Sequence, residues 1–280
     1  MYPFLHVGSF VVSSFSATML LGFLVATGVG VRQARFVGVP TVIVWQLLPW
    51  AAAGGVIGAK LYSLLFQLPR FLRGDLALWQ LGEVWYGGLA LGIVATAWRF
   101  ARSGYPMHWL FDYAGAPVAF GHMIGRVGCF LVGDDYGIPT SGPLGVVFPH
   151  GTPPTTAASL RAQGVFVAPG TPADSILAVY PVQLFEAIAL LCIGLWLWRQ
   201  SRRAHRPLGV FAQYLLLYGG WRFAIEFIRV KDDHLWFGLT SAQLVSLTMV
   251  TGALVLMRRR GPIEAAPPEH AALTAVAHAS

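Results

Sequence analysis

Apolar runs long enough to cross a bilayer recur along this 280-residue sequence, and they constrain its fold more than any other feature. A spanning helix needs about 20 mostly apolar residues, because backbone polar groups must be satisfied within the segment across the hydrocarbon core. Only 11% of the residues are charged, against about a quarter in soluble domains. The sequence therefore predicts an all-α membrane protein with no separate soluble domain.

About seven runs meet this length rule, and a long polar segment separates the fourth from the fifth. That segment, residues 133–179, is rich in Pro, Gly, Thr and Ser, and we call it the long loop. Loops of this length are usually functional or disordered. Residues 261–280 predict a disordered tail, so the transmembrane domain is expected to cover residues 1–260. The expected spans are Ser9–Val31, Val42–Phe66, Tyr86–Phe100, Trp109–Val132, Pro181–Trp198, Gly209–Ile228 and Ser241–Met257.

Lys and Arg are distributed unequally between the two sides of the expected bundle. The larger set follows the first, third, fifth and seventh spans, and the positive-inside rule makes that side cytoplasmic. The N-terminus and the long loop are then outside, and the C-terminus is inside. These basic loops account for the net charge of +7, so we expect no nucleic-acid partner.

Several charged and polar side chains interrupt the apolar spans. A charge at the bilayer centre costs at least about 2.5–3.5 kcal/mol, so such residues usually face a polar interior and are functional. Buried ion pairs that only join helices are the alternative interpretation, and composition alone leaves both open. The residues concerned are Lys60, Asp112, His122, Arg126, Gln183, Glu186, Arg222 and Glu226.

Two of these spans carry arginine at helical spacing with other polar residues. Residues three, four and seven positions apart share one helix face. Arginine binds phosphate through a planar fork, and the abundant phosphate of a bilayer is a lipid headgroup. Two such faces that meet near one membrane surface predict a phospholipid site at the outer leaflet. The faces contain His122, Arg126 and Cys129 in the fourth span, and Tyr218, Arg222, Glu226 and Arg229 in the sixth.

Glycines cluster in the second and third spans. Gly54, Gly55 and Gly58 lie within one span, where close helix packing is the favoured explanation. Gly87 and Gly88 begin the next span beside the polar residues, where packing and ligand binding are equally reasonable.

The motifs together resemble the prolipoprotein diacylglyceryl transferase family. The family signature is Gly-Arg-x-Gly-Asn-Phe-x-Asn-x-Glu-x-x-Gly, and the chain has Gly125-Arg126-Val127-Gly128-Cys129-Phe130-Leu131-Val132-Gly133-Asp134-Asp135-Tyr136-Gly137. The similarity runs from about Phe15 to Ser246. Further matches, in the family's order, are Gly58-Ala59-Lys60-Leu61, Trp85-Tyr86-Gly87-Gly88-Leu89, Asp112, Pro181-Val182-Gln183-Leu184-Phe185-Glu186 and Tyr218-Gly219-Gly220-Trp221-Arg222-Phe223-Ala224-Ile225-Glu226-Phe227.

The resemblance implies a reaction in the bacterial inner membrane. The family transfers diacylglyceryl from phosphatidylglycerol to the lipobox cysteine of a preprolipoprotein, forms a thioether and releases glycerol phosphate, with no metal or organic cofactor. Arg126 then corresponds to the arginine associated with phosphatidylglycerol binding, and Arg222 to a second essential arginine. Asp134 stands where the family has Glu.

The chain also departs from the family pattern. Tyr86 replaces a histidine, Cys129 and Val132 replace asparagines, Phe15 replaces a tyrosine and Lys60 replaces an arginine. We therefore take Tyr86 and His122 as alternative candidates for the base. The candidate catalytic residues are Arg126, Arg222, Tyr86, Asp134 and His122. The candidate phospholipid contacts are these two arginines with Lys60, Gly87, Gly88, Gly137, Gln183, Tyr218 and Glu226.

Three alternative functions fit parts of this pattern. A catalytically altered paralogue that binds phospholipid or lipoprotein would explain the replaced histidine and asparagines. A related transferase with another acceptor or lipid would keep the arginines. A transporter is disfavoured, because the sequence shows no internal repeat.

Overall fold

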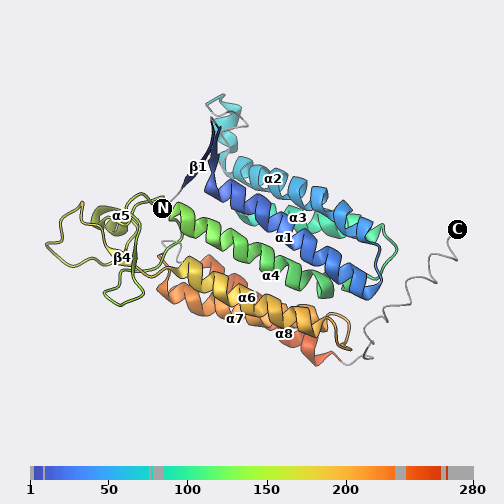
Figure 1. Ribbon diagram of the computed structural model, residues 1–280. Coiled ribbons are helices and arrows are strands. Elements are labelled where there is room, and N and C mark those ends of the chain that lie inside the picture. Colours follow the sequence, from blue (N-terminus) through green and yellow to red (C-terminus); the bar gives the residue numbers. More distant parts are fainter. Residues whose placement is uncertain are drawn as a thin grey trace. The chain divides into compact units, whose positions relative to one another are not determined.

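The computed structural model describes residues 3–8, 10–75, 77, 85–230, 238–259 and 263. Each expected span coincides with a helix among these residues (Figure 1). Five described helices, α1, α2, α4, α6 and α8, are long and apolar enough to cross a membrane. The third and sixth expected spans are the shorter helices α3 and α7. The helices are α1 (Ser14–Val37), α2 (Thr41–Leu72), α3 (Trp85–Ala101), α4 (Met107–Val132), α5 (Ala157–Ala162), α6 (Val182–Gln200), α7 (Gly209–Ile225) and α8 (Ser241–Arg258).

These helices make the chain an all-α membrane protein, as the apolar runs predict. The described strands are short and form two antiparallel pairs. One pair is β1 (Phe4–Val7) with β2 (Phe10–Ser13), and the other is β3 (Val146–Val147) with β4 (Ala178–Val179). The tail predicted at residues 261–280 lies outside the described residues, apart from residue 263.

The first span begins later than the predicted Ser9. Residues Phe10–Ser13 form β2, which pairs with β1, and α1 starts at Ser14. The β-branched residues Val11 and Val12 favour an extended backbone, and their apolar character made the strand look like the start of the span. The second span extends further than predicted, because α2 continues to Leu72.

The chain divides into two compact units. The first contains the described parts of Met1–Ala26 and Gly115–Glu264, and the second contains Thr27–Ala114. Both α1 and α4 pass from one unit into the other.

The second unit depends on close packing between α2 and α3. A Cβ added at Gly88 would lie 2.7 Å from the carbonyl oxygen of Gly55, and one at Gly54 would lie 2.8 Å from that of Leu91. Gly58 and Gly87 face each other so closely that a Cβ on either would collide with the other's carbonyl oxygen. Small residues allow such approaches in membranes. The packing interpretation therefore holds for Gly54 and Gly58 and applies to Gly87 and Gly88 as well, whereas a Cβ on Gly55 would meet nothing within 4 Å.

The first unit has an apolar core between α4, α6 and α7. Ala119, Leu190, Leu197 and Val210 are fully buried there, and Tyr218 lies at the core's polar edge. Close backbone contact again joins helices: α1 meets α4, where a Cβ on Gly121 would lie 2.9 Å from a backbone carbonyl oxygen. These contacts fix α4 and α7, the two helices that carry the predicted arginine faces.

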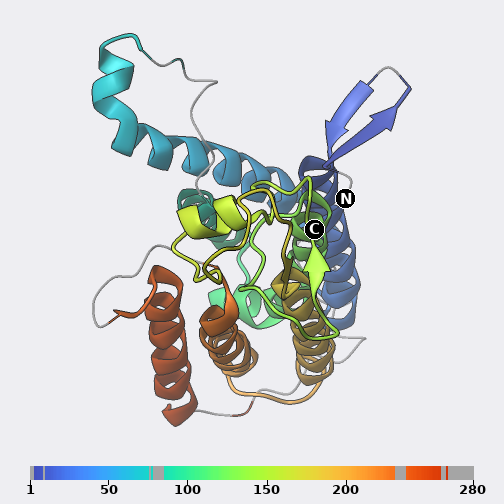
Figure 2. The ribbon, with the colours of Figure 1, turned by 90° about the vertical axis from the view of Figure 1, so that its left-hand side faces the viewer.

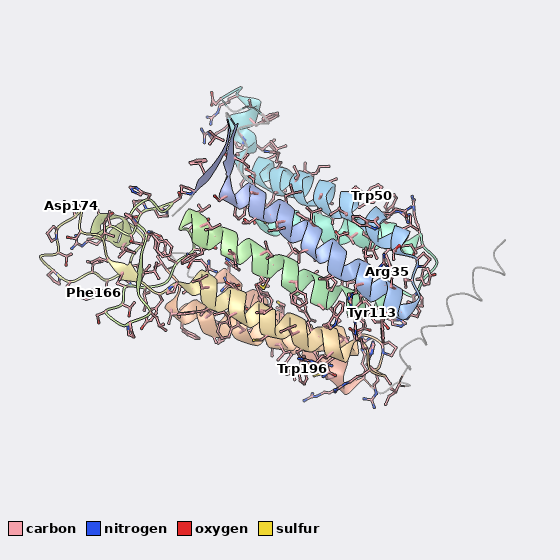
Figure 3. All side chains as sticks on the ribbon, in the orientation of Figure 1. Arg35, Trp50, Tyr113, Phe166, Asp174 and Trp196 are labelled. Carbon is pink, nitrogen blue, oxygen red and sulfur yellow. The ribbon has the colours of Figure 1, made fainter. Side chains whose placement is uncertain are left out.

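The long loop folds at one end of α4 and α6 (Figures 1 and 2). It contains β3, α5 and β4, and it has a small core of its own that includes Tyr136, Phe148, Leu160 and Val179. Phe166 and Asp174 mark its exposed surface in Figure 3. Because this core is packed, the loop is a folded element that borders the helix ends, which is where the polar residues gather.

Candidate active site

The two arginine faces of the sequence meet around one buried carboxylate. Glu186 on α6 is 1% exposed, and its Oε2 lies 3.0 Å from Nε of Arg126 on α4. Its Oε1 lies 4.0 Å from Nε of Arg222 on α7. Arg222 also pairs through Nη1 with Glu226, one helical turn later. Three helices thus contribute one charged group each to the same point.

A third arginine joins this group from the end of α7. Arg229 follows a short 3₁₀ turn, Glu226–Ile228, and its side chain is only 2% exposed. Its Nη2 lies 2.6 Å from Oδ1 of Asp135, and its Nη1 lies 3.7 Å from Oε2 of Glu226. Asp135 also accepts a 3.0 Å hydrogen bond at Oδ2 from Nη1 of Arg126. We call Arg126, Arg222, Arg229, Asp135, Glu186 and Glu226 the arginine cluster.

The arginine cluster is electrically balanced, with three cationic and three anionic side chains. Balance is required because a buried charge without a partner is costly. Neutral groups complete the shell: the hydroxyl of Tyr218 donates to Oε1 of Glu186 at 3.2 Å, and that of Thr240 donates to Oε1 of Glu226 at 2.9 Å. The ring of His122 lies edge-on to that of Tyr218, with centroids 5.3 Å apart.

The turn after α4 decides which aspartate reaches the arginines. Gly133 has a positive φ of 76°, and the amide of Asp134 donates to the carbonyl of Cys129, the bond of a Schellman helix end. Asp135 also adopts the left-handed region, at a φ of 56°, which aspartate tolerates better than most residues. This second left-handed residue turns the Asp135 carboxylate back toward Arg126.

Asp134, which the sequence aligns with the family's glutamate, faces elsewhere. Its carboxyl lies near the thiol of Cys129, and its carbonyl oxygen accepts from the buried side-chain amide of Gln183. Burial raises the pKa of Asp134, and the negative charge of Asp135 raises it further. The structure therefore places Asp135, which was not among the candidate site residues, in the ion pairs with Arg126 and Arg229.

Gly137 fixes the backbone on which Arg229 is carried. It forms an antiparallel bridge with Arg229, and its amide donates to the carbonyl of Tyr180 at 2.9 Å. A Cβ on Gly137 would lie 2.6 Å from the carbonyl oxygen of Ile228, so glycine is required there by close approach of the backbone. Arg229 belongs to the predicted arginine face of the sixth span, but it was not among the candidate site residues.

The other predicted site residues lie in the second unit. Lys60 is on α2, half-buried, and Gly87 and Gly88 are on α3. Tyr86 belongs to the first turn of α3, and its side chain lies outside the described part of the structure.

One group in the described residues has the donor types of a metal site. Ligand atoms of Cys129, Asp134 and Asp135 lie within 4.8 Å of one another. Both oxygens of Asp135 face arginine nitrogens, however, at 3.0 and 2.6 Å. These guanidinium groups compete for the carboxylate and repel a cation, so the geometry favours an anion site at this point.

Comparison with known proteins gives a consistent result. The family model for prolipoprotein diacylglyceryl transferase matches residues 3–259. A phosphatidylglycerol–prolipoprotein diacylglyceryl transferase from Stenotrophomonas maltophilia is 33% identical over 278 residues, which cover 92% of each chain. Proteins of the same name from Solidesulfovibrio magneticus and Xanthomonas oryzae are each 35% identical, and the matches cover 78% of this chain and 77% and 76% of theirs.

Proposed function

The chain belongs to the prolipoprotein diacylglyceryl transferase family, and from this premise we propose that it transfers diacylglyceryl from phosphatidylglycerol to the lipobox cysteine of a preprolipoprotein. The observation that carries the proposal is the arginine cluster. Arg126 and Arg222 come from different helices and flank one buried carboxylate, with side chains 13% and 12% exposed. Two partly buried guanidinium groups at one point suit a lipid phosphate.

The proposed reaction exchanges one bond for another. The bond from the glyceryl carbon to the phosphate oxygen breaks, glycerol phosphate leaves with the electron pair, and a carbon–sulfur bond forms. The nucleophile is the thiolate of the acceptor, so the thiol first gives its proton to a base. Arg126 and Arg222 stabilise the charge that develops on the departing phosphate. No metal ion or organic cofactor takes a step.

Tyr86 and His122 are the proposed candidates for the base. Tyrosine has a reference pKa of about 10, so Tyr86 needs a cationic neighbour to act near neutral pH. His122 is one helical turn from Arg126 and lies against Tyr218, which donates to Glu186. A base at either position must reach the acceptor thiol.

The remaining predicted residues have supporting roles in this proposal. Tyr218 donates a hydrogen bond to Glu186, and Glu226 pairs with Arg222. Gln183 fixes the turn after α4, and Gly137 fixes the backbone that carries Arg229. In the second unit, Gly87 and Gly88 lie against the backbone of α2 and allow the two helices to pack, and Lys60 remains a candidate phospholipid contact.

The proposed function also implies where the protein lies in the cell and how it is oriented in the membrane. The protein lies in the bacterial inner membrane, with the N-terminus and the long loop in the periplasm and the C-terminus in the cytoplasm. The unequal distribution of Lys and Arg supports this orientation. The transmembrane domain is residues 1–260, with a cytoplasmic tail at residues 261–280.

The test uses the purified protein in detergent with phosphatidylglycerol and a lipobox peptide. Glycerol phosphate release and a diacylglyceryl gain in peptide mass are measured together, with another family member as the positive control. We expect both products from the wild type. Binding of phosphatidylglycerol without either product would refute the transferase proposal and support a lipid-binding paralogue.

Arg126→Ala then tests the site. Loss of one group that stabilises the developing charge costs about 10²–10³ in rate, so transfer should fall by at least 100-fold. Arg203→Ala is the matched control, because Arg203 is an exposed arginine in the turn after α6. Full activity in folded, membrane-inserted Arg126→Ala would overturn the proposed role of the arginine.

A further inference from the structure

The three carboxylates of the arginine cluster differ sharply in exposure. The side chains of Glu186 and Glu226 are each 1% exposed, whereas that of Asp135 is 35% exposed. Glu186 and Glu226 also accept hydrogen bonds from the hydroxyls of Tyr218 and Thr240. Two carboxylates are therefore fixed inside the protein, and the third lies at its surface.

Asp135 contacts two arginines much as a phosphate group would. Its Oδ2 lies 3.0 Å from Nη1 of Arg126, and its Oδ1 lies 2.6 Å from Nη2 of Arg229. A phosphate group likewise presents several oxygens to guanidinium nitrogens. The position between Arg126 and Arg229 is thus a formed anion site that the protein's own carboxylate occupies.

A small cavity next to this position gives the side chain room to leave. Its volume is about 200 Å³, and Asp135 lines it together with Tyr136, Thr152 and Gln163. These neighbours supply hydroxyl and amide groups. A carboxylate that rotated into this cavity would exchange two ion pairs for these polar neighbours, and Asp134 also lines the cavity.

We infer that Asp135 is an exchangeable counter-ion: the lipid phosphate, proposed to bind Arg126 and Arg222, also replaces Asp135 at Arg126 and Arg229, and the carboxylate turns into the neighbouring cavity. The inference deepens the proposed function and rests on it. A phosphodiester carries one negative charge, so the exchange keeps the arginine cluster balanced. When transfer has produced glycerol phosphate, return of Asp135 to the arginines displaces that product.

Asp135→Asn tests this competition directly. If the native ion pairs occupy the site about nine-tenths of the time, their removal should tighten anion binding roughly tenfold. The dissociation constant of glycerol phosphate is measured by titration calorimetry on the whole protein in detergent. Asp135→Glu, which keeps a competing carboxylate, should bind within about twofold of the wild type.

Asp174→Asn controls for the change in net charge. Asp174 is exposed on the long loop (Figure 3), so its replacement removes one negative charge away from the arginine cluster. We expect little change in this variant. Unchanged or weaker binding in folded Asp135→Asn would overturn the inference, and so would equal tightening in Asp174→Asn.

A second measurement needs no variant. It tests whether an anion displaces the Asp135 carboxylate from the arginines even if Asp135→Asn does not fold. Wild-type protein is labelled with a carbodiimide and an amine, with or without sulfate as the probe anion, and modified carboxyls are located by mass spectrometry. Sulfate should increase the labelling of Asp135 and leave that of Asp174 unchanged. Unchanged or reduced labelling of Asp135 at saturating sulfate would refute the exchange.

These assays separate the two claims. Transfer activity with no tightening in Asp135→Asn would refute the exchange and keep the transferase. Tightening without any transfer product would keep the anion site and refute the transferase.

Discussion

Replacement of Glu186 by Gln should destabilise the first unit more than replacement of any exposed acid. Glu186 is 1% exposed, and it is the carboxylate between Arg126 and Arg222. Glutamine keeps the shape and can still accept from Tyr218, but it leaves the two guanidinium groups with one negative charge fewer. The variant isolates the electrostatic contribution, because little volume changes.

The magnitude follows from the burial of the pair. Removal of one partner of a buried ion pair costs about 3–5 kcal/mol, because the remaining charge is left uncompensated. Glutamine still accepts a hydrogen bond, so we expect the lower end, about 3 kcal/mol. For a protein of roughly 150–250 residues each kcal/mol corresponds to about 2–4 °C. The melting temperature should therefore fall by roughly 6–12 °C.

The chain provides a reporter for this experiment. Cys129 is buried beside the arginine cluster and Cys192 is exposed. In a Cys192→Ser background, reaction of a thiol-specific dye with Cys129 during heating in detergent reports the opening of the first unit. Asp174→Asn in the same background is the control and should change the melting temperature little. A melting temperature for Glu186→Gln within about 2 °C of its parent would refute the reasoning that Glu186 neutralises the two arginines.

Three further changes test other parts of the molecule. Gly87→Ala should destabilise the second unit, because its Cβ would collide with the backbone of α2, whereas Gly55→Ala has nothing within 4 Å and should be tolerated; thermal unfolding of the two variants in detergent compares them. Tyr86→His restores the family's histidine and should raise the transfer rate by up to the 10²–10⁴-fold that a general base typically contributes, as the mass assay would show. Asp134 has a raised pKa, so the folded protein holds its proton more tightly and the stability this group contributes is lost as pH rises above about 3.9. Relative to the wild type, Asp134→Asn should therefore be more stable at about pH 7 than at about pH 4. The same difference in melting temperature between variant and wild type at the two pH values would contradict this.

The sequence predicts the helices well because their cause is local. A run of about 20 apolar residues must satisfy its backbone internally in lipid, and each of the expected spans has a helix at its position. The same criterion misplaced the start of the first span. Phe10–Ser13 is apolar like the helix that follows it, and only the pairing with Phe4–Val7 makes it a strand.

The arginine cluster was predictable in part, for a related reason. Arg222 and Glu226 are one helical turn apart, so a regular helix places them on one face. Asp135 could not be distinguished from Asp134 in this way, because two left-handed residues after α4 decide which carboxylate turns back. Arg229 lies beyond the end of α7, where helical spacing no longer determines direction.

The departures from the family pattern follow one rule of charge. At the charged positions of the pattern, Lys60 replaces Arg and Asp134 replaces Glu, so the sign of the charge is kept. In the other replacements, such as Tyr86 for histidine, both the original and the new side chain can be uncharged. Loss of one charge from a balanced, buried set leaves its partner uncompensated, whereas a neutral exchange does not.

This rule predicts which part of the reaction differs from that of other family members. The groups proposed to hold the phosphate keep their charges, while the proposed proton acceptor changes from a group with a pKa near 6.5 to one near 10. The affinity for phosphatidylglycerol should therefore match that of a family member with histidine, and the transfer rate should continue to rise at alkaline pH where that enzyme's rate has levelled. A matching pH profile combined with a large difference in lipid affinity would show the opposite: that the replacements act on lipid binding and leave proton transfer as it is.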